Sequence, residues 1–433
     1  MLAGLIMSCG SGWGTPKITL HTTIPEGAKI RLYIASNDDV VIENATGGFK
    51  NGDYADYTVV KSPIVIQGSL QVLDCKESEI TLLELEEERS LEVLNCSGNK
   101  LKELNVSDCN GLKKLLCASN DINTITLPNN SELVLLDCFR NQLTELNLSQ
   151  SKNLGILICD ENKLASLDLK ENTKLTQLEC SYNSIETLDL SKHFMLEQLM
   201  CYGNGMTQLL LPASDRLERI YCYENNLSAL NVKQLPALTR LYCYENPLGY
   251  LDLTGNKNLV HLVCYKDQLK TLDLSQCEKL HVLECDENEI SHLDLSANTD
   301  LEEVYCYKNA ITGQNMDDLI TSLCDRKAME NRGKLCLFND LDGEETNVCS
   351  TLQVQKAREK GWDVYCKSPA GWKIYEGSEP SSVRGVAVDV DEIDVIYDTQ
   401  GHQLKNLCLG VNIVRTTSGE IRKVFMTDSK EIR

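Results

Sequence analysis

Cysteine recurs at a fixed interval along most of this chain. Twelve cysteines, from Cys75 and Cys96 to Cys285 and Cys306, lie 21 residues apart with no insertion or deletion between the first and the last. A constant period of roughly 20 to 50 residues indicates a solenoid, because each repeat can bury its apolar face only against the next one. We therefore expect twelve stacked coils over residues 70–312.

Other positions keep the register of these cysteines. The residue five before each cysteine is always Leu, and the residue two before is Leu except at Ile220 and Val304. The residue three after is Asn except at Ser78 and Asp267, so the unit is L-x-x-L-x-C-x-x-N-x-L. Side chains alternate along a strand, so we expect a short strand centred near each cysteine and a parallel sheet across the stack. The Asn amide can bond loop backbone groups that no strand satisfies.

This unit resembles the leucine-rich repeat. The cysteine in the third apolar position and a trailing L-D-L-S, at 188–191, 272–275 and 293–296, resemble the 21-residue, internalin-like bacterial form. The resemblance implies an α/β solenoid, a leucine-rich repeat horseshoe with a parallel β-sheet on its concave face. It covers most of the chain, because twelve consecutive units obey one template.

The segments on either side of the repeats lack their period. Residues 15–69 alternate like strands and are broken by Gly and Pro, so we expect a β-rich N-terminal cap that covers the open end of the solenoid. Residues 313–368 contain two helical and two strand-like patterns in alternation, which resembles the α/β C-terminal cap of the same bacterial family. Residues 369–433 are predicted to be a linker and a β-rich tail.

Both ends carry signals that bear on location. Residues 1–14 are interpreted as a remnant lipoprotein signal and linker, because the apolar start before Cys9 resembles a lipobox, although it lacks a basic region. Cys9 would then carry lipid; the alternative is a chance thiol. The tail strands "IYDxxG", "GVNIVR" and "RKVFM" resemble the C-terminal sorting domains of type IX secretion. Either signal predicts that the protein lies at the outer surface of the cell or is secreted. The lipobox would make it an outer-membrane lipoprotein, and the sorting tail would direct its export.

Charge and chemistry narrow the classes of function. The formal net charge of -22 argues against nucleic acid, which attracts basic patches, and membrane contact is expected only through the lipid anchor. The cysteine spacing lacks the short ligand intervals of metal sites, so we predict no metal and no cofactor. Thiols between apolar neighbours should be buried, inert and reduced. Strand spacing alone would permit disulfides, but uniform spacing argues against pairing two by two.

Tyrosine gathers at positions that the core does not explain. The residues three before, one before and one after each cysteine share the predicted concave face, and eight of the 16 tyrosines fall there, over about six coils. Tyr and Arg are enriched at the centres of interfaces. The candidate ligand-binding residues are Tyr202, Tyr221, Tyr223, Tyr242, Tyr244, Tyr265, Tyr305, Tyr307, Arg219, Arg240 and His261. The alternative is that neighbouring rings only stabilise the stack.

These observations favour a non-enzymatic surface protein that binds a protein or glycan on its concave face, in adhesion or another partner interaction, as a monomer. A structural envelope spacer is the first alternative, but a spacer has no need of a Tyr and Arg surface. An enzyme with a site in the caps is the second, but no G-x-S-x-G or H-E-x-x-H motif is present in the sequence.

Overall fold

The computed structural model describes most of the chain. The described residues are 16–129, 132–341, 343–378, 393–397, 403–404, 410–416 and 421–426. The predicted lipidation site Cys9 and the segment 1–14 lie outside them.

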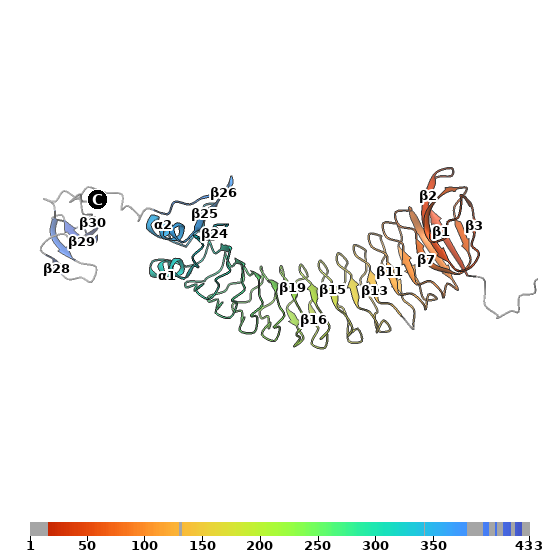
Figure 1. The fold of residues 1–433 in the computed structure, drawn as a ribbon, viewed down its shortest axis with the longest axis horizontal. Helices are drawn as coiled ribbons and strands as arrows, with labels where there is room; N and C mark the ends of the chain where they lie inside the picture. The colour runs from red at the N-terminus through yellow and green to blue at the C-terminus, as the bar shows by residue number, and fades with distance from the viewer. Residues whose placement is uncertain are drawn as a thin grey trace, which may run out of the picture.

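One long sheet runs along the inner side of a curved stack of coils (Figure 1). Each coil adds one strand in parallel, in a register that places residues 21 apart side by side, as in Leu94↔Leu115 and Leu115↔Leu136. The strands are β7 (Leu70–Asp74), β9 (Val93–Asn95), β11 (Lys114–Leu116), β13 (Leu135–Asp137), β14 (Ile156–Ile158), β15 (Gln177–Glu179), β17 (Gln198–Met200), β19 (Arg219–Tyr221), β20 (Arg240–Tyr242), β21 (His261–Val263), β22 (Val282–Glu284) and β23 (Glu303–Tyr305).

Each of these strands ends one residue before its cysteine, so the prediction of strands centred near the cysteines is wrong by about two residues. The reason is a turn two residues after the cysteine. There the backbone is left-handed in every coil, for example at Arg140 with φ of 53° and at Tyr182 with φ of 50°. Such a conformation cannot continue a strand, and only two of the twelve positions are the glycines that usually adopt it, Gly98 and Gly203.

The Asn column forms a ladder of side-chain hydrogen bonds inside the turn. Asn141 Nδ2 donates to the carbonyl of its own Cys138 (3.1 Å) and to that of Cys117 in the preceding coil (3.0 Å). Its Oδ1 accepts from the amide of Ile122, also in the preceding coil (3.0 Å). The other Asn residues of the column repeat this pattern, as Asn99 and Asn288 do. The predicted role of the Asn column is confirmed.

Ser78 departs from the column because it lies in the first coil, which has no preceding cysteine carbonyl to bond. Its hydroxyl donates instead to the carbonyl of Lys76 (3.0 Å), and its own carbonyl accepts from the hydroxyl of Thr22 in the N-terminal segment (2.8 Å). The first rung is thus completed by a segment outside the repeats.

All twelve ladder cysteines are buried free thiols. Burial raises their pKa values, to about 12 for Cys96. Cys109 and Cys277 are also buried, in a second column on the far side of the coils. In that column the amide of Asn298 donates to the carbonyl of Cys277 (2.7 Å). A thiol in this setting behaves as a small apolar side chain.

Two sheets close the N-terminal end of the solenoid. One contains β3 (Val41–Glu43), β6 (Ile64–Gln67), β1 (Lys17–Thr22) and β8 (Ile80–Glu86), in that order. The other sheet is the concave sheet itself, which continues antiparallel from β7 through β2 (Lys29–Ser36) and β5 (Asp53–Val59) to β4 (Ala45–Thr46). Because both sheets contain a strand of the first coil, this segment covers the core that the first coil would otherwise expose.

The concave sheet also continues beyond the last ladder strand. β24 (Gly333–Asn339) and β25 (Trp362–Ser368) add in parallel and β26 (Gly371–Ile374) adds antiparallel, while α1 (Gln314–Ser322) and α2 (Thr351–Glu359) precede β24 and β25 respectively. Asn347 supplies the next rung of the amide ladder out of register, since its Oδ1 accepts from the amide of Ile311 (3.0 Å) and its Nδ2 donates to the carbonyl of Cys306 (2.8 Å).

The outer side of the coils has little regular structure. Short parallel pairs form between β10 (Glu103–Asn105) and β12 (Thr124–Thr126), and between β16 (Thr187–Asp189) and β18 (Gln208–Leu210). The described parts of the tail form a separate antiparallel sheet in the order β28 (Gln403–Leu404), β27 (Ile393–Tyr397), β29 (Gly410–Thr416) and β30 (Ile421–Met426).

Candidate binding face on the concave sheet

Four tyrosines form a continuous stack on the concave sheet. Tyr202, Tyr223, Tyr244 and Tyr265 each follow a ladder cysteine, so the 21-residue register places one ring over the next. Successive ring centroids lie 4.2, 4.3 and 4.3 Å apart, and the ring planes differ by 10°, 9° and 18°. We call these four residues the tyrosine stack. Each ring is half-buried, and each is more tightly packed than an isolated surface tyrosine.

The hydroxyl groups of Tyr223, Tyr244 and Tyr265 remain protonated at physiological pH. Burial, followed by the neighbouring rings, raises the pKa of Tyr223 and of Tyr244 well above the ordinary value for a phenol. Burial also raises the pKa of Tyr265 to about 12. A protonated phenol both donates and accepts hydrogen bonds, so the row presents a line of neutral polar groups along its edge.

Tyr182 extends the stack, although the repeat pattern does not predict it. It lies two residues after Cys180, at the left-handed turn, and its side chain is 48% exposed. Its ring packs edge-on against Tyr202, with centroids 5.1 Å apart and planes at 87°. Its offset from the cysteine is one residue larger than that of the stack residues, so alternation along a strand would place its side chain on the opposite face of the sheet. The turn that follows the strand instead directs the ring toward the same face as the stack.

Other predicted residues flank the stack on the strands. Tyr221 and Tyr242 pack edge to face across β19 and β20, with centroids 5.0 Å apart. Arg219 and Arg240 begin the same two strands and are exposed, and Arg219 Nη1 donates to Gln198 Oε1 (3.2 Å). His261 is half-buried at the start of β21, and its pKa is lowered by burial and then by the charge of Arg240.

Tyr305 and Tyr307 belong to a different cluster. The stack is interrupted after Tyr265 because the next coil has Asp286 at that position. Both later tyrosines instead pack against Trp372 of β26, at centroid distances of 5.6 and 5.9 Å. Sequence reasoning did not include Trp372, since it lies outside the repeats.

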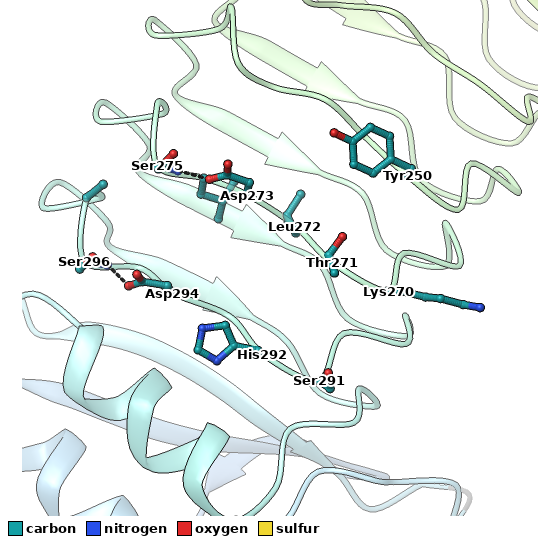
Figure 2. A pocket seen from close by; sticks show the side chains of 12 residues that line it. Tyr250, Lys270, Thr271, Leu272, Asp273, Ser275, Ser291, His292, Asp294 and Ser296 are labelled. Carbon is teal, nitrogen blue, oxygen red and sulfur yellow. Dashed lines mark hydrogen bonds between the residues drawn. The ribbon is translucent and has the colours of Figure 1, made fainter.

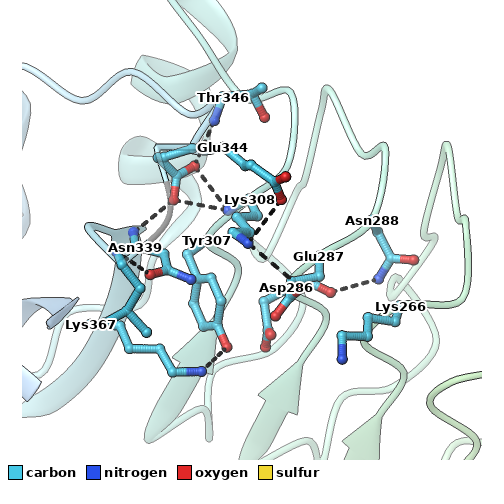
Figure 3. A network of polar contacts seen from close by, with 12 residues as sticks. Lys266, Asp286, Glu287, Asn288, Tyr307, Lys308, Asn339, Glu344, Thr346 and Lys367 are labelled. Carbon is cyan, nitrogen blue, oxygen red and sulfur yellow. Dashed lines mark hydrogen bonds and ion pairs between the residues drawn. The ribbon is translucent and has the colours of Figure 1, made fainter. Parts of the chain in front are cut away.

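Tyr307 is also enclosed by polar neighbours (Figure 3). It is only 5% exposed, and its hydroxyl accepts a hydrogen bond from Lys367 Nζ (3.1 Å). Beside it, Lys308 lies between Glu287 (3.9 Å) and Glu344 (3.4 Å). We therefore leave Tyr307 out of the candidate face, because its contacts join the last coil to the C-terminal segment.

A hollow on the outer side of the coils is explained by local turns (Figure 2). It is lined by Tyr250, His292 and the L-D-L-S segments of two neighbouring coils. Asp273 and Asp294 accept the amides of Ser275 and Ser296 at 2.9 Å. These hydrogen bonds lower the pKa of both carboxyls. The acidic groups of this hollow are thus already used to shape the turn.

The described part of the chain contains neither a candidate metal site nor a candidate membrane-spanning helix. Among its residues, no group of three or more His, Cys, Asp or Glu side chains could hold a metal ion. No helix in the described ranges is both long enough and apolar enough to span a membrane.

Comparison with known proteins places the fold. Two solved structures align over most of this chain: the leucine-rich repeat domain of APL1B (16% identity, 77% of this chain and 93% of that one, TM-score 0.54) and an internalin, InlF, from Listeria monocytogenes (16% identity, 69% and 86%, TM-score 0.51). The chain has the leucine-rich repeat fold. Its solenoid is internalin-like, with a cysteine at the third apolar position of each coil.

A further match is the functional domain of InlJ from Listeria monocytogenes, which is described as including a cysteine ladder (21% identity, 82% of this chain and 89% of that one, TM-score 0.48). No protein-family model and no curated protein sequence matches this chain.

Proposed function

We propose that this leucine-rich repeat protein is a non-enzymatic binding protein that takes a protein partner on its concave face. The tyrosine stack is the observation that carries this proposal. Four rings from four consecutive coils are held in a fixed row on the concave side, with Arg219 and Arg240 exposed beside them. Solenoids use such extended concave surfaces for binding, and rigid tyrosines give large contact area with little loss of side-chain entropy.

The geometry of the stack favours a protein over a glycan. A sugar ring binds to the open face of an aromatic ring, but here the rings lie about 4.2 to 4.3 Å apart and cover one another's faces. The edges and the hydroxyl groups of the row remain for a ligand. An edge of this kind suits the mixed apolar and hydrogen-bonding surface of a protein.

A purely structural spacer is the second candidate, favoured by the ring contacts themselves, since stacked rings stabilise adjacent coils. Two features go beyond this role. The guanidinium of Arg240 forms no side-chain hydrogen bond or ion pair within the described part of the chain and is exposed, and Tyr182 is 48% exposed at the end of the row. An unpaired guanidinium and an exposed ring beside a rigid stack are suited to an outside partner.

The proposed location is the cell surface or the external medium. Two signals in the sequence support it, the lipobox-like residue Cys9 and the strands of the C-terminal tail. Replacing Cys9 should release the protein from membrane fractions if the anchor operates, and deleting residues 379–433 should trap it in the periplasm if the tail operates. A distribution that neither change alters would overturn the location.

The binding proposal is tested by displaying surface and secreted proteins on an array and probing it with the full chain. A partner captured by the native chain and lost with Tyr223→Ala/Tyr244→Ala supports the concave face. Glycans spotted on the same array serve as the competing class. A ligand retained by the double variant would place the binding site elsewhere.

A further inference from the structure

A hollow opens in the concave sheet next to the N-terminal end of the tyrosine stack. Side chains of four successive coils line it: Asp137, Phe139, Ile158, Asp160, Glu161, Glu179, Tyr182, Met200 and Tyr202. The hollow results from a difference in size among the side chains that directly follow the ladder cysteines. Phe139 and Tyr202 supply rings, whereas the two coils between them have the smaller Asp160 and Ser181.

The carboxylates around this hollow are held in place but not neutralised. Three of the four accept a hydrogen bond from the solenoid: Asp137 from the amide of Phe139 (3.1 Å), Asp160 from the amide of Ser181 (2.7 Å), and Glu179 from the side chain of Gln177 (2.5 Å). In the described part of the chain none of these three forms an ion pair; only Glu161 meets a cation, Arg140, at 3.9 Å.

Because these three carboxylates are partly or fully buried, their charges without a counter-charge cost free energy. Asp160 is 8% exposed, and burial, with a smaller contribution from the charge of Glu179, raises its pKa to about 6. Burial also raises the pKa of Asp137. Ser181 follows Cys180 in the next coil, and its backbone amide is the donor to Asp160. Buried carboxylates normally have a counter-charge, so Asp137 and Asp160, which line the hollow without one among the described residues, indicate a site that is completed by a cationic ligand.

The aromatic walls specify the kind of cation. Tyr182 and Tyr202 meet edge to face at 87°, which leaves part of the Tyr182 ring exposed beside the carboxylates. Ring faces attract ammonium and guanidinium groups, and carboxylates pair with them. The carboxylates do not converge closely enough to form a metal site among the described residues. An organic cation with an apolar stem therefore fits this hollow better than a bare ion does.

We propose that this hollow binds a Lys or Arg side chain of the protein partner, an inference that rests on the proposed function of the concave face. The stem of that side chain would lie against Ile158 and Met200, and its charged end would meet Asp160 and Glu179. This contact would fix the position of the partner along the concave sheet. Its basic residue would lie beside Tyr182, and the neighbouring part of its surface would cover the tyrosine stack.

The test uses the full chain and two peptide probes, tetra-arginine and its neutral analogue tetra-citrulline, titrated at about 0.15 M salt. The variant Asp160→Asn/Glu179→Gln removes two charges while keeping the acceptor oxygens that bond Ser181 and Gln177. The matched control Glu145→Gln/Glu186→Gln removes two exposed charges from coils of the same region, away from the concave strands.

We expect the hollow variant to weaken tetra-arginine binding about tenfold, the control to weaken it less than about twofold, and tetra-citrulline to bind neither strongly nor differently among variants. Equal losses in both variants would show that long-range charge alone attracts the peptide and would overturn the proposal. No loss in the hollow variant would overturn it as well. If a captured partner is lost with Tyr223→Ala/Tyr244→Ala but kept with the hollow variant, this inference fails while the proposed function stands.

Discussion

The Sγ of Cys243 lies 3.3 Å from Oδ2 of Asp267, at a rung of the amide ladder where a carboxyl group replaces the usual amide. Asp267 is fully buried, and its Oδ1 accepts the amide of Asn246 (2.9 Å). Where other coils have an Asn Nδ2 that donates to two cysteine carbonyls, Asp267 can donate only when it is protonated. Burial accordingly raises the pKa of Asp267 to about 8.

The first prediction is that Asp267 makes the stability of the solenoid depend on pH. Because its folded pKa lies above the ordinary value of 3.8, the folded state holds a proton that the unfolded chain releases. The resulting stabilisation is fully present below about pH 3.8 and is lost as pH rises through about 8. The variant Asp267→Asn should remove this dependence and restore the rung, with a gain at pH 8 that exceeds the gain at pH 6 by on the order of 2 kcal/mol.

Chemical denaturation at pH 6 and pH 8 measures this effect. Asp273→Asn serves as the control, since Asp273 is exposed on the outer side and already bonded by Ser275. A gain from Asp267→Asn that is equal at both pH values would mean that the folded carboxyl is already ionised at pH 6, as it is in the unfolded chain, and would contradict the raised pKa.

The sequence predicted the inner half of each coil well because one physical requirement is repeated there. Residues such as Leu94, Cys96 and Asn99 can take only one place in a stacked coil, and the structure confirms all three. The strand boundary was misplaced because the left-handed turn after the cysteine is occupied by Ser, Arg, Glu, Tyr and Lys as well as Gly, so no residue type marks it.

Residues outside the period could not be placed in this way. Asn347 completes the amide ladder, and Trp372 packs against the last two concave tyrosines, but both lie in segments without the 21-residue spacing. Tyr307 lies at the same offset from its cysteine as the stack residues, and the sequence pattern groups it with them for that reason alone. An intervening Asp286 separates Tyr307 from Tyr265, and only the packing of the C-terminal segment shows that it is buried.

The second prediction concerns the ladder thiols. Alkylation in native buffer should miss these twelve cysteines, because they are buried and their pKa values are raised, so little thiolate is present. Denaturation without reductant should make all twelve reactive. Peptide mapping by mass spectrometry provides the measurement, and Cys324, which is only partly buried, is the internal reference that should react first. Disulfide-linked ladder peptides would contradict the free thiols of the structure.

The third prediction concerns the amide ladder. Asn141→Ala removes two hydrogen bonds to buried cysteine carbonyls and one from the amide of Ile122. The carbonyls of Cys117 and Cys138 each keep one other amide donor, and the buried amide of Ile122 loses its side-chain acceptor. The expected cost is about 3 kcal/mol of unfolding free energy. Gln142→Ala, at the exposed neighbouring position, should change stability by less than about 0.5 kcal/mol. Equal midpoints for the two variants in denaturant would contradict the role assigned to the ladder.

The fourth prediction separates binding from stability in the tyrosine stack. Tyr223→Ala/Tyr244→Ala removes the three stacked contacts that join Tyr202 to Tyr265, which should lower stability by about 2 to 4 kcal/mol without opening the leucine core. Partner affinity should fall by more than about 2 kcal/mol, because central aromatic anchors dominate protein interfaces.

Two comparisons make this result decisive. Tyr223→Phe/Tyr244→Phe retains the rings and should keep the stability of the stack, so any loss of affinity in it measures the hydroxyl groups alone. Lys76→Ala/Ser97→Ala changes the equivalent positions of the first two coils, which lie far along the sheet from the stack, and should leave affinity nearly unchanged. Thermal unfolding and a binding titration are run on all three variants. A lowered melting temperature with full affinity in the alanine variant would assign the tyrosine stack to stability alone, because a partner that contacted the row would lose its anchors when the rings are removed.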